Sequence, residues 1–201
     1  MANTIGPRGF VPSRYLDGSA WNGAVNLYWI PAADALVYSP GDAVKSLANA
    51  DANGIPGVVK AAGTDTVRGV IVGVQMANYN NTSLVGTSLD LTVQNIPAAK
   101  GKDYYVLVVD DPAVLFELQD DGLAALTATS ANKNASFTVA NPTAPSQLSQ
   151  SVLSTASVAT TAALNLKIVG LAQKPNNAFG TYANWLVKFN QHELAGGTAG
   201  V

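Results

Sequence analysis

The chain has 201 residues, which is enough to bury one good core without requiring a second domain. Only 12% of its residues are Asp, Glu, Lys or Arg, against roughly 25% in a typical soluble domain. A net charge of −2 with no basic run argues against direct nucleic-acid binding. The absence of cysteine excludes disulfides and thiolate chemistry, and no run approaches the ~18 apolar residues of a membrane span.

Residues 1–23 are predicted to form an extended arm, because Gly and Pro recur too closely for any regular element. Bulky or cationic side chains are spread along this arm: Arg8, Phe10, Arg14, Tyr15 and Trp21. Such groups on a flexible backbone favour docking onto another surface. The alternative is an arm wrapped on its own core. No apolar leader precedes it, so we expect synthesis in the cytoplasm without a cleaved signal.

The remaining residues, 24–201, are predicted to form a single β-rich domain whose first half consists of short strands between turns. Strands are expected at 25–30, 43–47, 66–75 and 89–93, with loops at 49–57 and 77–88. Within 66–75, Gly69 and Gly73 indicate a bulge, a bend or a close approach by another element.

The central segment, residues 103–122, predicts two strands that each end in an acidic pair. The run Tyr104–Val109 is apolar without a break, so both of its faces should be covered. The run Val114–Gln119 is less uniform and is expected nearer a sheet edge. Its flanking pairs, Asp110-Asp111 and Asp120-Asp121, would lie roughly 30 Å apart along an extended strand. Paired catalytic carboxylates sit within about 10 Å, so the acidic pairs are assigned to turns.

The second half begins with an Ala/Ser/Thr-rich excursion at about 127–163. Within it a strand is predicted at 135–139 and one or two helical turns at 147–153. Further strands are expected at 164–171 and 184–190. About eight strands without a long amphipathic helix predict an all-β fold, a compact β-sandwich or barrel of jelly-roll-like type with long loops.

The sequence offers no catalytic, cofactor-binding or metal-binding residues. His192 is the only histidine, and no elbow motif identifies partners for a catalytic triad. We therefore expect it to face solvent or an interface. Neither a phosphate-binding loop nor an EF-hand spacing is present. The chain is predicted not to be an enzyme and to have no small-molecule substrate.

Several motifs, taken in order, resemble the decoration or cement proteins of tailed-bacteriophage heads. After the Gly/Pro/Arg arm come SPGDAV at 39–44, GVIVGV at 69–74 and YYVLVVDDPAVLFELQDDG at 104–122. LKIVGLAQKPNNAFG at 166–180 and WLVKFNQHELAGGTAGV at 185–201 complete the pattern. The likeness covers most of the chain except the Ala/Ser/Thr-rich excursion.

The resemblance implies a β-rich virion protein that binds the exterior of a capsid and bridges major capsid subunits, as a homo-oligomer on the shell. Contact candidates are the arm residues already named together with Trp185, Phe189 and His192. Deleting residues 1–20 is expected to weaken capsid binding and to leave the isolated fold intact. The alternatives are a tail or fibre component and a carbohydrate-binding adhesin.

Overall fold

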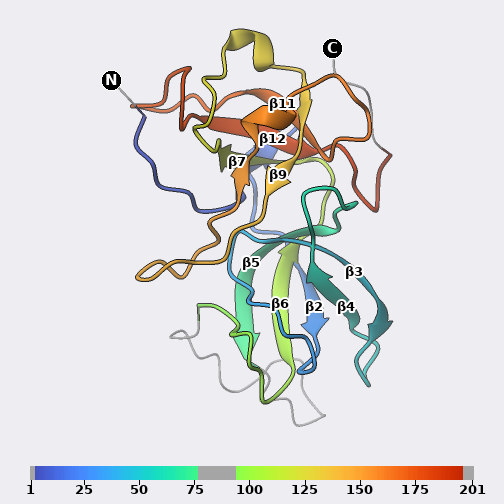
Figure 1. Cartoon of the computed structure of the whole chain (residues 1–201). Helices are drawn as coiled ribbons and strands as arrows, with labels where there is room; N and C mark the ends of the chain where they lie inside the picture. Colours follow the sequence, from blue (N-terminus) through green and yellow to red (C-terminus); the bar gives the residue numbers. More distant parts are fainter. Residues whose placement is uncertain (1–2, 77–93, 197–201) are drawn as a thin grey trace.

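A computed structural model describes residues 3–76 and 94–196, and within them almost all regular structure is strand (Figure 1). The first six strands are β1 (Val11–Tyr15), β2 (Asn26–Ile30), β3 (Ala43–Ala50), β4 (Pro56–Lys60), β5 (Gly69–Met76) and β6 (Tyr104–Val109). The next six are β7 (Val114–Gln119), β8 (Asn134–Ala135), β9 (Phe137–Thr138), β10 (Val152–Leu153), β11 (Leu166–Leu171) and β12 (Asn184–Phe189). Two single 3-10 turns, Ala128–Ser130 and Thr155–Ser157, are the helical elements of these residues. The predicted all-β fold class is confirmed.

Five strands close into a barrel in the order β2-β4-β3-β5-β6. Its ladders are antiparallel except the β2–β4 contact, which is parallel and pairs Trp29 with Gly57. Inward side chains of these strands form a buried apolar cluster that includes Tyr28, Ile30, Val44, Val58, Ile71, Val106 and Val108. Five of the six β6 residues are buried, so the expectation that both faces of this apolar run are covered is confirmed.

The second layer is a five-stranded antiparallel sheet with the order β1-β7-β12-β11-β8, seen above the barrel in Figure 1. Alternate residues of its strands point toward the barrel, and the inward set of β12 is Trp185, Val187 and Phe189. They share one cluster with barrel residues such as Val70 and Val109. The sheet and the barrel are therefore joined by a continuous apolar core.

The two central strands do not pair with each other. β6 lies between β2 and β5 in the barrel, and β7 lies between β1 and β12 in the sheet. β7 is next to the edge strand β1 in its sheet, whereas β6 lies in a closed barrel, so β7 is the strand nearer an edge, as expected. Both of its backbone sides are nevertheless paired, one with β1 and the other with β12. The acidic pair after β6 forms the crossover: Asp110 is held inside the barrel layer, and Asp111 accepts a hydrogen bond from the Ala113 amide at 2.8 Å.

Three predictions need correction. The arm does contain regular structure, since β1 pairs with β7. The loop predicted at 49–57 is too long at its C-terminal end, because β4 begins at Pro56. Proline is tolerated at the first position of a strand. Residues 147–153 form no helical turn and contribute β10 instead. The predicted strand at 89–93 and the loop at 77–88 lie outside the described residues.

Gly69 and Gly73 serve different purposes in β5. A Cβ on Gly69 would sit 2.3 Å from the Val109 carbonyl oxygen, so the close approach of β6 requires glycine there. Gly73 follows a β-bulge between Ile71 and Gly73 in the same ladder. Both readings of the glycine pair, a bulge and a close approach, are confirmed.

Candidate interaction site

The eight predicted contact residues divide into a buried and an accessible set. Phe10, Trp185, Phe189 and His192 are at most 4% exposed. The expectation that these four contact a partner is wrong for this conformation, because their side chains are already enclosed by the chain itself. The accessible residues are Arg8 and Arg14, which are exposed, and Tyr15 and Trp21, which are half-buried.

Phe10 is the anchor of the arm. Its ring meets Phe137 and Phe189 at centroid distances of 5.1 Å and Phe116 at 6.1 Å, edge-on to Phe116 and Phe137. Such aromatic pairs add stabilisation beyond the area they bury. Of the two readings of the arm, the one in which it wraps on its own core therefore describes residues 10–15.

The neighbouring Gly9 explains how the arm reaches this position. Its backbone has φ of +65°, and a Cβ there would lie 2.4 Å from the Gly41 carbonyl oxygen and 2.6 Å from the Ser149 side chain. The Phe10 amide donates to the Gly41 carbonyl at 3.0 Å. Only glycine can pass this close to Gly41 and Ser149. Gly9, which the sequence suggested was a flexible position, therefore fixes the arm against the barrel.

Trp185 is fixed by Asp120 at the end of β7. The indole Nε1 donates to the Asp120 carboxylate at 3.1 Å, and the amides of Tyr182, Ala183 and Gly122 donate to the same group. Burial raises the pKa of Asp120 above its ordinary value, although these donors oppose the shift. Asp120 therefore holds the connection to β12 in place. It lies at the end of β7, as predicted, but most of its partners are distant in the sequence and only the Gly122 amide is local.

His192 belongs to a polar cluster where the barrel meets the C-terminal segment. Asp110 accepts hydrogen bonds from Asn26 at 2.8 Å and from the Tyr28 hydroxyl at 2.6 Å, and Arg68 Nε donates to the same hydroxyl at 2.8 Å. Burial, with the hydrogen bond to Asp110, raises the pKa of Tyr28 to about 12. Tyr28 is therefore protonated at neutral pH and acts as a bridge between Arg68 and Asp110.

The histidine itself is neutral at pH 7. Burial lowers the pKa of His192, and the positive charge of Arg68 acts in the same direction. Its Nδ1 accepts a hydrogen bond from the Leu194 amide at 3.1 Å. The expectation that His192 faces solvent or an interface is therefore wrong, because its side chain is buried and helps to hold the C-terminal segment. The sequence around a single histidine does not show whether its side chain is buried.

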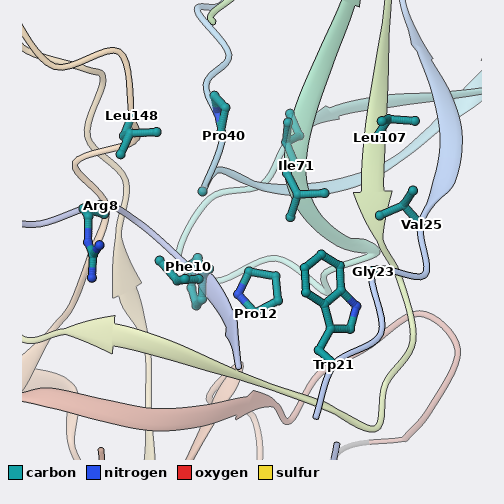
Figure 2. Close-up of a pocket in the computed structure, with 13 residues that line it drawn as sticks. Arg8, Phe10, Pro12, Trp21, Gly23, Val25, Pro40, Ile71, Leu107 and Leu148 are labelled. Carbon is teal, nitrogen blue, oxygen red and sulfur yellow. The ribbon is translucent and has the colours of Figure 1, made fainter. Parts of the chain in front are cut away.

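A pocket of about 500 Å³ opens between β1 and the barrel and is the candidate site for a partner's side chain (Figure 2). It brings together Arg8, Phe10 and Trp21 from the arm with Ile71 and Leu107 from the barrel. Its walls are predominantly apolar, and Figure 2 places Arg8 near Leu148 at one end and Trp21 near Val25 at the other. Such a pocket suits an apolar group more than a charged one.

Trp21, in the wall of this pocket, has an indole N–H group without a hydrogen-bond partner in the described part of the protein. Its indole Nε1 is buried and makes no hydrogen bond within the chain. Buried indole N–H groups usually find an acceptor. Both rings line the pocket, but Phe10 is buried in the core whereas Trp21 is half-buried, and the sequence pattern alone did not separate them.

Within 3–76 and 94–196, no group of three or more His, Cys, Asp or Glu side chains is arranged to hold a metal ion. None of the helical segments in the described part of the chain has the length and apolar character needed to span a membrane.

Comparison of the chain with models of protein families, with curated proteins and with solved structures finds no match in any of the three.

Proposed function

We propose that the protein is a structural virion protein that binds the outer surface of a bacteriophage head and bridges neighbouring major capsid subunits. The proposal draws on the resemblance of the ordered motifs to head decoration proteins and on the way the chain uses its few charges. It assigns the protein to the capsid exterior of the virion, after synthesis in the host cytoplasm. It requires no enzymatic activity, cofactor or direct nucleic-acid contact.

The observation that carries the proposal is the internal engagement of the carboxylates. The chain has 13 Asp and Glu residues, of which 12 lie in the described ranges. Each of these 12 side chains accepts a hydrogen bond from the same chain or forms an ion pair within it. Asp51 is typical: it accepts from the amides of Asn53 and Ile55 and from the Tyr105 hydroxyl. The acids therefore build turns and connections.

This arrangement leaves the exterior mainly to Ala, Ser, Thr, Asn and Gly. Small neutral side chains pack against a neighbouring protein at little desolvation or rotamer-entropy cost. Such a surface suits a subunit that is covered by neighbours over much of its area. The accessible members of the predicted contact set, Arg8, Arg14, Tyr15 and Trp21, lie on or beside β1 and supply the larger contact groups.

The proposed mechanism is binding that favours one lattice state. A subunit that binds the expanded shell, and has low affinity for separated capsid subunits, stabilises the shell by mass action. Many weak sites repeated over a closed surface act together with high avidity. The added contacts across capsomer junctions would oppose the pressure of packaged DNA.

The test is occupancy of heads that lack this protein. Purified protein is added to expanded heads of the virus that encodes it, and electron cryomicroscopy reads out the result. Icosahedrally ordered extra density on the outside is the expected outcome. Absence of such density refutes the proposal; rods or trimers of the protein alone would then favour a tail or fibre component, and glycan-array binding would favour an adhesin.

A further inference from the structure

Arg8 is the cation of the pocket between β1 and the barrel, and it lines the end near Leu148 (Figure 2). Its side chain is exposed, and within the described part of the chain its guanidinium forms no ion pair and no hydrogen bond. The carboxylates of the same residues are engaged elsewhere. On an open surface water would satisfy such an arginine, but beside an apolar pocket it marks a place for an anionic group.

The backbone on both sides of Arg8 is fixed. The Pro7 carbonyl accepts a hydrogen bond from Gln150 Nε2 at 3.2 Å, and the Phe10 amide donates to the Gly41 carbonyl at 3.0 Å. Arg8 is therefore presented from a rigid segment while its side chain stays free to bind. A cation held in this way loses less conformational freedom when a ligand arrives.

The pocket beside Arg8 has fixed apolar walls and an accessible interior. Phe10 and Ile71 are at most 1% exposed, whereas Leu107 and Leu148 are half-buried and keep apolar surface in contact with solvent. A Cβ on Gly23 would meet no atom within 4 Å, so this part of the wall is open. The volume of about 500 Å³ accommodates one large apolar side chain together with its adjacent backbone.

We infer that the pocket receives a large apolar side chain of a partner protein, and that Arg8 binds a carboxylate next to that side chain in the partner's sequence. The inference rests on the proposed function, which makes the partner the major capsid protein. The apolar side chain gains free energy by leaving water, and the planar guanidinium holds a carboxylate through two parallel hydrogen bonds. The predicted capsid segment therefore places a leucine, isoleucine or phenylalanine beside an aspartate or glutamate.

The neighbouring surface favours a protein over a small molecule as the occupant. Arg14 and Tyr15, the other accessible contact candidates of β1, continue from the pocket along the same strand. A protein segment seated in the pocket reaches them, whereas a small molecule does not. Charge complementarity at Arg8 would also speed association and select the docking orientation.

The variant Arg8→Glu tests the charged contact. Lys102→Glu is its matched control, because it changes the net charge equally and lies two residues before β6, at the barrel end remote from the sheet (Figure 1). Binding to expanded heads that lack the protein is measured at low and high salt. Arg8→Glu should weaken binding about tenfold at low salt and less at high salt, and Lys102→Glu should bind as the wild type does.

The variant Leu148→Trp tests the apolar contact. Leu148 lies between β9 and β10, outside the strands, so a larger side chain there breaks no sheet ladder. The indole should occupy part of the pocket and weaken binding about tenfold at both salt concentrations, because an apolar contact is not screened. Urea unfolding of each variant checks that it is folded, and Arg8→Glu keeps the test decisive if Leu148→Trp is not.

The outcomes separate the inference from the proposed function. Wild-type affinity of both Arg8→Glu and Leu148→Trp would overturn the inference and leave the proposed function standing, and an effect of one variant alone would refute the other contact. Failure of the wild type to bind heads would overturn both. Dodecanoate is the probe for a small amphipathic anion. If it binds, Leu148→Trp abolishes its binding and head binding is unaffected by it, the site is a small-molecule pocket and the inference is refuted.

Discussion

Replacing Phe10 with alanine tests whether the N-terminal arm belongs to the core. The ring is 1% exposed and contacts three other phenylalanines, so its loss opens a cavity among Phe116, Phe137 and Phe189. Truncation of a buried phenylalanine typically costs 3–5 kcal/mol, and we expect about 4 kcal/mol here because the edge-on contacts are lost with the apolar area. For a domain stable by roughly 5–15 kcal/mol, this is a large fraction.

The assay is equilibrium urea unfolding at pH 7, with the free energy of unfolding extrapolated to water. Ile5→Ala is the matched control: Ile5 also lies in the arm but is 65% exposed, so its truncation should change stability by less than about 0.5 kcal/mol. The expectation that deleting residues 1–20 leaves the fold intact is therefore wrong: the deletion should be at least as damaging as Phe10→Ala, because it removes β1 as well as Phe10. A loss under about 1 kcal/mol for Phe10→Ala would refute the assignment of the arm to the core.

Three further predictions concern a titrating group, a buried ion pair and a close backbone approach. The lowered pKa of His192 means that its stabilising effect is present above its unfolded value of 6.5 and is lost as pH falls through the lower folded pKa. Urea unfolding from pH 7 to 5 should therefore show a loss of at most about 1.4 kcal/mol per pH unit that His192→Gln abolishes; an unchanged slope would contradict this. Lys60→Met should cost about 3–5 kcal/mol in thermal or urea unfolding, because the Lys60–Asp42 pair at 2.8 Å is nearly fully buried. Adding Asp42→Asn should recover part of the loss, and a neutral single variant would show that the pair is dispensable. Gly69→Ala should destabilise by about 1–3 kcal/mol through its clash with the Val109 carbonyl, whereas Gly170→Ala, at an open position, should not; equal effects would disprove the clash.

Local pattern was sufficient for most of the strands. The apolar run of β6 and the alternation of β11 and β12 identify these elements because burial on one or both faces imposes a characteristic order of side chains. The two acidic pairs were assigned correctly to strand ends, where an Asp side chain can accept local amide hydrogen bonds whatever the rest of the fold. Asp111 and Asp121 both do so, accepting amide hydrogen bonds from Ala113 and Leu123.

The contact residues were harder to predict because flexible surroundings suggested accessibility. Phe10 and Trp21 have similar neighbours in the chain and both line the pocket, yet only the Phe10 ring is buried in the core. The difference arises from Gly9, whose contact with Gly41 directs the arm inward. The position of the Gly41 turn depends on the closed barrel, so the sequence of residues 1–23 alone could not predict the contact between Gly9 and Gly41.

The amino-acid sequence by itself determined that this is an all-β chain with few charges, because strand periodicity and composition act locally and additively. Only the tertiary structure decided that β6 and β7 belong to different layers, that the arm completes the core, and that Arg8 lines a pocket between β1 and the barrel. Each of these depends on which distant strands pair, and pairing depends on the register and packing of the whole chain.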